Sequence, residues 1–187
     1  MLPITNDVMA EISALQWLTP DQLKALCEKT GCTVANVNSA AQQVLSGSKD
    51  AIAAAATAAK ELGIRRAIPL ATAGGFHSPF MAPAREKLAP ILDTVAFSAP
   101  KFPVLSNVTG QPHSSDPGAI KAMMLEQVTG TTNWAADVET AKALGCTTFV
   151  EFGPGKVLSG LVKKIDAALT TANVDDLASL EATVAAV

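Results

Sequence analysis

The first seventy residues of this sequence alternate between strand and helix signals, and this alternation restricts the possible folds more than any other feature. Short apolar and β-branched runs are separated by two segments that carry helix-capping residues at their ends. The predicted strands are residues 9–15, 33–37, 43–46 and 65–70, and the predicted helices are 20–30 and 49–62. The order strand–helix–strand–strand–helix–strand is typical of the ferredoxin-like fold. We therefore assign a ferredoxin-like small subdomain to residues 8–71.

Capping residues set the limits of both helices. Thr19 is followed by proline and, three residues on, by Gln22, which together predict a capping box at the start of the first helix. Gly31 is well placed to end that helix, and Ser48 to cap the second one. Pro69 cannot donate a hydrogen bond to a neighbouring strand, so we expect the last strand at a sheet edge.

The rest of the chain also alternates between helices and strands, but with fewer strands. Helices are predicted at 79–93, from 117 onward, at 133–144 and at 156–169, strands at 102–108 and 147–152, and a last amphipathic helix within 174–187. Strands separated by helices indicate a parallel α/β layer. Two strands are too few for an independent sheet, so we expect other polypeptide to cover or extend it.

Composition excludes several classes of protein. The 187 residues are 49% hydrophobic and 17% charged, which argues against disorder, and no run approaches the ~18–20 apolar residues of a membrane span. A net charge of −3 and the absence of Tyr argue against nucleic-acid binding. The N-terminus does not resemble a secretory signal, and the three cysteines fit neither a disulfide framework nor a metal site. We expect a cytoplasmic protein with no metal, membrane or nucleic-acid partner.

His77 is the outstanding candidate for chemistry. It lies in the run Gly-Gly-Phe-His-Ser-Pro at residues 74–79, directly before a predicted helix N-terminus. Glycines let the backbone approach a ligand closely, and the positive end of a helix disfavours a protonated imidazole. A neutral histidine can serve as a general base, although a lone histidine is also commonly structural.

Other polar residues have a structural interpretation beside the functional one. Gln127 lies near the end of a predicted helix and either hydrogen-bonds across a cleft or faces solvent. Asn36, Asn38 and Gln42 cluster around a turn, where side-chain amides often cap the backbone. Residues 151–156 form a glycine-rich strand-to-helix turn that either cradles a phosphate or is merely structural, since it lacks the Walker spacing.

Four stretches carry a resemblance to a known family. They are 35–47, Gly-Phe-His-Ser-Pro-Phe-Met at 75–81, Pro-Val-Leu-Ser-Asn-Val-Thr-Gly at 103–110, and Glu-Phe-Gly-Pro-Gly-Lys-Val-Leu-Ser-Gly-Leu at 151–161. They resemble, in the same order, segments of the malonyl-CoA:acyl carrier protein transacylases, over about residues 8–166. The resemblance implies an α/β fold in which the ferredoxin-like subdomain precedes the C-terminal part of an α/β-hydrolase-like acyltransferase domain. That part takes residues 72–170, and 171–187 form a C-terminal helical tail.

The resemblance also implies a reaction. In this family malonyl passes from coenzyme A to the phosphopantetheine thiol of acyl carrier protein, in fatty acid biosynthesis, through an acyl-serine. His77 takes the role of base and later acid, and a carbonyl at Gln127 that of the acceptor orienting it. Phe76 and Asn38 are assigned to substrate binding, Phe76 as the bulky residue that leaves no room for an α-methyl group. The coenzyme A thioester is a substrate, and no cofactor is implied.

The sequence departs from the family pattern in its nucleophile. It contains no Gly-x-Ser-x-Gly elbow, and the arginine for the malonyl carboxylate and the early glutamine of the oxyanion hole are also missing. The turn has Ala40 and Ala41 in place of Pro-Gly. All three missing features belong to a part that would precede residue 1. We therefore expect a truncated or split transacylase, inactive alone, with a complementary N-terminal half as a possible partner.

Two other functions stay open. The chain is alternatively a non-catalytic module that docks a carrier protein or another subunit. A hydrolase that pairs Cys146 or Cys32 with His77 is a third, weaker hypothesis. In each case we expect the helices at 120–128 and 157–169 to leave apolar faces uncovered, so that the isolated chain is sticky or oligomeric.

Overall fold

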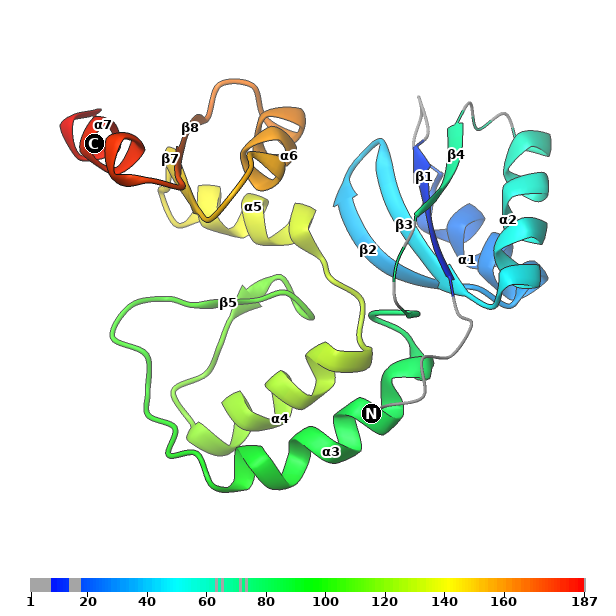
Figure 1. Cartoon of the computed structure of the whole chain (residues 1–187), viewed down its shortest axis with the longest axis horizontal. Helices are drawn as coiled ribbons and strands as arrows, with labels where there is room; N and C mark the ends of the chain where they lie inside the picture. The colour runs from blue at the N-terminus through cyan, green and yellow to red at the C-terminus, as the bar shows by residue number, and fades with distance from the viewer. Residues whose placement is uncertain are drawn as a thin grey trace.

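The computed structural model describes residues 8–13, 18–62, 64, 66–70, 72 and 74–186 (Figure 1). Its first part consists of β1 (Val8–Ser13), α1 (Pro20–Thr30), β2 (Thr33–Ser39), β3 (Gln42–Gly47), α2 (Lys49–Glu61) and β4 (Arg66–Leu70). The strands form an antiparallel sheet in the order β2-β3-β1-β4, and both helices lie on one side of it. This confirms the predicted ferredoxin-like topology.

The capping signals act as the sequence predicts. The Thr19 hydroxyl accepts from the Gln22 amide at 3.2 Å, and the Gln22 side chain accepts from the Thr19 amide at 2.9 Å. Gly31 ends α1 with a φ of 75°, a left-handed conformation that glycine adopts without strain. The Ser48 side chain caps α2. Pro69 lies in β4, whose one partner among the described strands is β1, so the predicted edge position is confirmed.

The main core lies between this sheet and its two helices. Its buried members are Leu18, Leu26, Cys32, Leu45, Ile52, Ala55, Ala58, Ala59 and Ile64. Successive strand residues point to opposite faces, so Val34 and Leu45 contact this core while Ala35 and Val44 are buried on the other side. Strand β2 also contacts α5 (Trp134–Ala143) and α6 (Val157–Ile165) of the second part.

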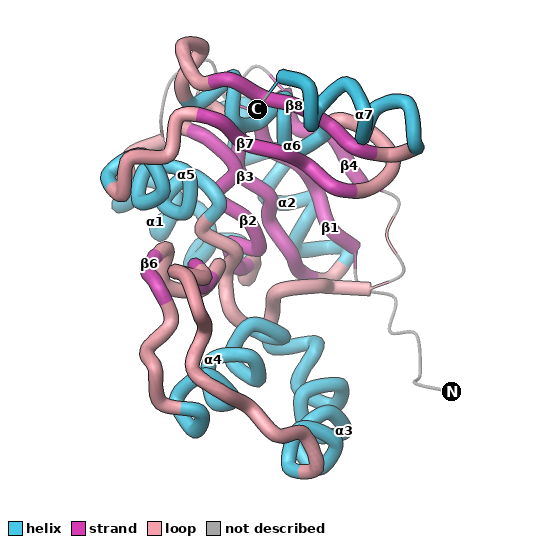
Figure 2. The backbone as a smooth tube through the Cα atoms, turned by 90° about the vertical axis from the view of Figure 1, so that its left-hand side faces the viewer, coloured by secondary structure: helices cyan, strands magenta, loops and turns pink. Residues whose placement is uncertain are grey.

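The second part follows a short 3₁₀ turn, η1 (Pro79–Met81). Its elements are α3 (Ala82–Asp93), β5 (Leu105–Ser106), β6 (Gln111–Pro112), α4 (Pro117–Thr129), α5 (Trp134–Ala143), β7 (Thr148–Phe152), α6 (Val157–Ile165), β8 (Thr170–Val174) and α7 (Leu177–Ala186). β7 and β8 pair in parallel, as expected of an α/β layer (Figure 2). Val138, Val162 and Leu169 form a small core beside them. None of the helices among the described residues is long and apolar enough to cross a membrane.

The structure corrects the predicted strand at 102–108. Of the predicted residues, only Leu105 and Ser106 (β5) form a strand, and β5 pairs with β6 in a short antiparallel hairpin. The chain reverses because the amides of Thr109 and Gly110 both donate to the Ser106 carbonyl. Gly110 has a φ of 66°, and a Cβ there would overlap Ala136 of α5. This stretch therefore contains a strand of only two residues, followed by a turn that packs on a helix.

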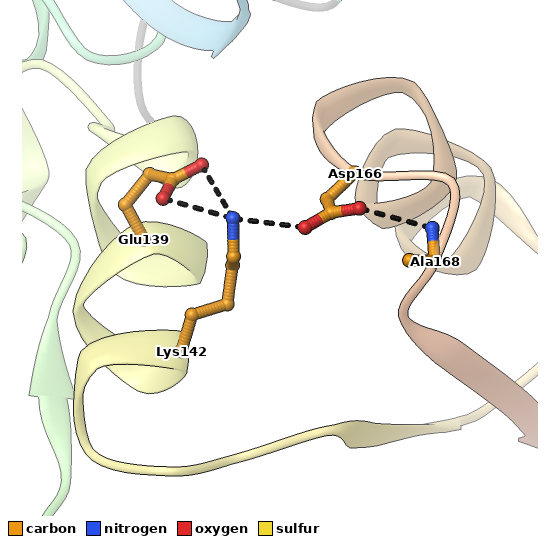
Figure 3. Close-up of polar contacts among 4 residues, drawn as sticks. All are labelled: Glu139, Lys142, Asp166 and Ala168. Atoms are coloured by element: carbon orange, nitrogen blue, oxygen red, sulfur yellow. Dashed lines mark hydrogen bonds and ion pairs between the residues drawn. The ribbon is translucent and has the colours of Figure 1, made fainter.

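The structure also corrects the C-terminal region. The predicted helix 156–169 ends at Ile165, because Asp166 is extended (φ −148°) and its carboxylate accepts from the Ala168 amide at 2.9 Å. The chain then forms β8, so the expected helical tail at 171–187 is helical only from Leu177. Asp166 also binds Lys142 of α5 at 2.9 Å, which ties α5 to the end of α6 (Figure 3).

Candidate active site

The turn that carries His77 is fixed by buried hydrogen bonds. The Ser78 side chain, fully buried, donates to the Gly75 carbonyl at 2.5 Å and accepts from the Phe80 amide at 3.3 Å. His77 itself has a φ of 54°, which is uncommon for a residue with a side chain. Such backbone strain persists where the surrounding structure enforces it, and it concentrates at functional sites. The turn therefore holds the imidazole in one direction.

Two main-chain carbonyls fix the tautomer of the imidazole. The Nδ1 atom of His77 lies 3.2 Å from the carbonyl oxygen of Gln127 and 3.2 Å from that of Gly130. Carbonyl oxygens only accept hydrogen bonds, so Nδ1 must carry the hydrogen. The neutral ring then has its lone pair on Nε2. This is the form that a general base requires, with a third group orienting the base.

Both carbonyls belong to the C-terminal end of α4. The last carbonyls of a helix have no partner within it, and Gly130 caps this helix. They also carry the partial negative charge of the helix dipole, which stabilises a cationic ring nearby. The helix that directly follows His77 begins as the 3₁₀ turn η1. The helix end that contacts the ring is that of α4, fifty residues further along the chain.

Thr132 is a third contact of the imidazole that the sequence analysis missed. Its hydroxyl oxygen lies 3.4 Å from both Nδ1 and Nε2, so it stays beside the ring whichever nitrogen carries the proton. It also accepts from the side-chain amide of Gln127 at 3.2 Å. Thr132 is only 9% exposed. No local sequence pattern signals this contact, because it depends on how β2 meets the loop after α4.

The two predicted substrate-binding residues occupy different places. Phe76 is 40% exposed and directly precedes His77. Asn38 lies in β2, where the pairing with β3 is irregular between Val37 and Ser39. No hydrogen bond joins the Asn38 side chain to another described residue. The neighbouring turn is instead held by Gln43, whose buried amide donates to the carbonyls of Ser39 and Ala40.

The glycine-rich turn after β7 is structural. The Glu151 carboxylate accepts from the amides of Leu158 at 3.0 Å and Ser159 at 2.8 Å, and so occupies the N-terminus of α6. Burial raises the pKa of Glu151, but the hydrogen bonds from Ser159 and Leu158 together outweigh burial and hold the pKa below its ordinary value. Gly153 and Gly155, with φ of 126° and 91°, let the chain reverse. The turn therefore positions an internal carboxylate where a phosphate would otherwise bind.

The chain is similar to known proteins over most of its length. No protein-family model matches the chain. It is 41% identical over 148 residues to a malonyl-CoA:acyl carrier protein transacylase of Bacillus subtilis, covering 79% of this chain and 46% of that protein. The crystal structure of an acyl carrier protein S-malonyltransferase from Vibrio cholerae superposes with a TM-score of 0.89 and 34% identity, covering 97% of this chain and 60% of that one. The chain is homologous to part of the malonyl-CoA:acyl carrier protein transacylases.

A second similar structure has a carrier protein bound. It is a malonyl-transacylase in complex with a type II PKS acyl carrier protein, with a TM-score of 0.91 and 32% identity, and the match covers 100% of this chain and 60% of that one. The resemblance inferred from four motifs is thus confirmed, as is the acyltransferase fold. The chain spans about half to three fifths of the length of these transacylases. The roles of His77, Gln127, Phe76 and Asn38 stay predictions.

The cysteines give no support to the hydrolase hypothesis. Burial raises the pKa of Cys32, and burial, Cys32 and Glu28 together raise the pKa of Cys27 to about 11. The thiolate is the nucleophilic form, so both environments suppress reactivity. Cys146 is exposed at the end of α5 and has no hydrogen bond to His77. Among the described residues, no cluster of three or more His, Cys, Asp or Glu has the arrangement of a metal site.

Proposed function

We propose that this chain is the histidine-bearing part of a malonyl-CoA:acyl carrier protein transacylase of fatty acid biosynthesis. The nucleophilic serine comes from polypeptide outside residues 1–187, in the same protein or in another. The proposal rests on the two main-chain carbonyls that accept hydrogen bonds from Nδ1 of His77. With the hydrogen on Nδ1, the lone pair of Nε2 is free to act as a base. The similarity to transacylases over most of the chain supports it. Residues 8–71, 72–170 and 171–187 are the small subdomain, the large-domain part and the tail.

In the first half-reaction the serine attacks malonyl-CoA. Nε2 of His77 takes the proton of the serine hydroxyl as the serine oxygen bonds to the thioester carbonyl carbon. The ring becomes an imidazolium, stabilised by the Gln127 and Gly130 carbonyls at the end of α4. It then gives the proton to the sulfur of coenzyme A as the carbon–sulfur bond breaks. The product is malonyl-serine, and His77 is neutral again.

In the second half-reaction the carrier protein accepts the malonyl group. Nε2 of His77 takes the proton of the phosphopantetheine thiol, and the sulfur attacks the carbonyl carbon of malonyl-serine. The proton passes to the serine oxygen as the carbon–oxygen bond breaks. The transfer needs no cofactor, because the thioester is itself the substrate. Phe76 and Asn38 line the acyl site in this proposal, Phe76 excluding an α-methyl group, and the enzyme acts in the cytoplasm.

Complementation with a serine-bearing part tests the proposal. The chain is co-expressed with the region of the Bacillus subtilis transacylase that lies outside the match, and transfer of radiolabelled malonyl is measured. His77→Asn removes the imidazole while tolerating the left-handed backbone, since Asn is enriched at positive φ. We expect it to slow transfer by about 10²–10⁴-fold. His113→Asn is the matched control, because the contact of His113 with Val104 is through its backbone amide.

Two outcomes contradict this function. One is full transfer by the complemented His77→Asn variant. The other is acid-stable malonyl label on the isolated chain, which contains no Gly-x-Ser-x-Gly elbow to form it.

A docking module is the second candidate function. It is favoured by the similar transacylase structure that has an acyl carrier protein bound. Binding of carrier protein by the isolated chain, with no malonyl transfer after complementation, supports the module. Transfer after complementation supports the enzyme.

A further inference from the structure

The segment that follows α4 pairs with the edge of the small sheet. This connecting segment consists of Thr131, Thr132 and Asn133. The Thr132 amide donates to the Ala35 carbonyl at 2.8 Å, and the Thr132 carbonyl accepts from the Val37 amide at 2.8 Å. The bridge between Asn36 and Thr132 is parallel. The connecting segment therefore extends the small sheet beyond β2, its edge strand.

Further contacts at both ends lock the connecting segment. The Thr131 hydroxyl donates to the Val34 carbonyl of β2 at 2.7 Å. At the other end, the Asn133 amide donates to the Asn107 carbonyl and the Asn133 side chain to the Val108 carbonyl, both at 2.6 Å. The segment thus has one attachment on the small subdomain and one on the turn after β5. Partly buried hydrogen bonds such as these are costly to leave unmade, so they hold the segment against both of its neighbours.

The connecting segment is continuous with the groups that orient the imidazole. Gly130, whose carbonyl accepts from Nδ1 of His77, directly precedes Thr131. The Thr132 hydroxyl accepts from the Gln127 side chain and contacts the ring. Helix ends fray readily, and the carbonyls of Gln127 and Gly130 lie at the end of α4. Something outside the helix must hold them in register with the ring, and the contacts of Thr131 and Thr132 do so.

We propose that Thr131 and Thr132 are positioning residues for His77, through which strand β2 of the small subdomain holds the two carbonyls that fix its tautomer. The catalytic meaning of this inference rests on the proposed function of His77 as a base. The small subdomain then sets the geometry of the reacting group in addition to any contact that it makes with substrates. A displacement near 1 Å at a reacting group can reduce a rate by about 10²-fold, so such support matters.

Nuclear magnetic resonance of the imidazole tests the inference without any transfer assay. The chain has two histidines, so ¹⁵N-histidine labelling gives two sets of ring signals, and His113→Asn assigns them. Spectra are taken well above the ordinary histidine pKa of about 6.5. In the wild type we expect His77 to show the Nδ1–H tautomer. Thr131→Val and Thr132→Val remove the hydroxyl contacts while keeping the β-branched shape, and we expect the Nδ1–H form to lose its dominance in both.

A matched variant and a second measurement guard against simple misfolding. Thr33→Val removes a similar bond between β2 and β3, which the Thr33 hydroxyl donates to the Ser46 carbonyl at 3.3 Å, on the side of β2 away from the connecting segment. It should leave the His77 signals unchanged. In the wild type, the Thr132 and Val37 amides should exchange with solvent as slowly as strand amides. The inference is overturned by wild-type His77 signals in both threonine variants, by an equal change in Thr33→Val, or by fast exchange of those two amides. If both threonine variants lose the Nδ1–H form but still transfer malonyl at the wild-type rate after complementation, the inference stands and the proposed function of His77 as the base is contradicted.

Discussion

The four-stranded small sheet and the parallel β7–β8 pair each pack helices against a face, but they bury different amounts of apolar surface. Among the described residues, nine buried residues form the core of the small sheet, and three form the core beside β7. Around β7, β8 and their helices, large apolar side chains face outward, with Phe152 75%, Val157 72% and Leu177 70% exposed. Parallel sheets are ordinarily covered on both faces. The small sheet therefore has a substantial apolar core of its own, whereas the β7–β8 region leaves large apolar side chains exposed.

Self-association is the largest expected consequence of that difference. We predict that the chain alone forms oligomers through the apolar surface of the β7–β8 region, because exposed apolar patches bind partners or aggregate. The double variant Phe152→Lys with Val157→Lys should shift the population toward monomer in analytical ultracentrifugation. Leu62→Lys is the control, since Leu62 is 49% exposed but follows α2 on the small subdomain. A monodisperse wild-type monomer would show that the exposed side chains are harmless.

The same contrast explains which parts of the fold the sequence could predict. In the small subdomain, Thr19, Gly31 and Ser48 determine the helix limits through local hydrogen bonds, and these predictions are confirmed. In the second part, β8 was missed because Thr170–Val174 becomes a strand only by pairing with β7. The strand at 102–108 was too long because only Leu105 and Ser106 find a partner strand, β6. Helix caps depend on neighbouring residues and can be predicted from one sequence. Strand pairing between residues far apart in the chain cannot.

The candidate site divides in the same way. His77 stood out from its glycine-rich neighbours and the helix that follows. Its left-handed φ of 54° and its contact with Thr132 arise only in the folded chain. The Gln127 carbonyl was assigned through a family resemblance, because no spacing rule joins residues fifty positions apart. The group that orients the ring is therefore a main-chain carbonyl. The identity of the side chains in a sequence does not indicate which main-chain carbonyl will lie next to the ring.

Core truncation is the next largest effect. Leu45 is fully buried in the small-sheet core, and Leu45→Ala should destabilise that subdomain by about 2–5 kcal/mol in urea unfolding. Leu158→Ala in α6 is the comparison, because Leu158 is 41% exposed and its loss should cost less than about 1 kcal/mol. Equal losses of unfolding free energy in the two variants would mean that Leu45 contributes no more to stability than the partly exposed Leu158 does.

Asp137 makes the stability of the second part depend on pH. Both its carboxylate oxygens are buried without a hydrogen-bond partner among the described residues, and burial raises the pKa from 3.8 to about 6. The pKa of Asp137 is higher in the folded chain than in the unfolded one, so protonation of Asp137 favours the folded state. The resulting contribution to the free energy of unfolding is fully present below pH 3.8 and is lost as pH rises through about 6. The loss amounts to at most about 3 kcal/mol. Asp137→Asn should abolish it and stabilise the chain at neutral pH.

Urea midpoints measured across this pH range check the effect. Asp50→Asn is the control for the loss of one carboxylate charge, since Asp50 is exposed at the start of α2. If Asp137→Asn follows the wild-type profile, the buried carboxylate has found a partner in solution. The second part would then contain a hydrogen-bond partner for the Asp137 carboxylate, and its polar groups would be better paired than its exposed apolar side chains indicate.

Two equivalent helix caps give the smallest and most discriminating comparison. Thr19 accepts from the Gln22 amide in the small subdomain, and Asp116 accepts from the Ala119 amide at 2.6 Å in the second part. Replacing either cap by alanine should cost about 1 kcal/mol. If the small sheet is a separate unit, Thr19→Ala should lower only the transition followed by amide exchange in β2 and β3. Asp116→Ala should lower only the one followed in α4. Should both variants shift a single transition by the same amount, the two regions unfold together, and the connecting segment at Thr131–Asn133 joins them more strongly than their separate cores suggest.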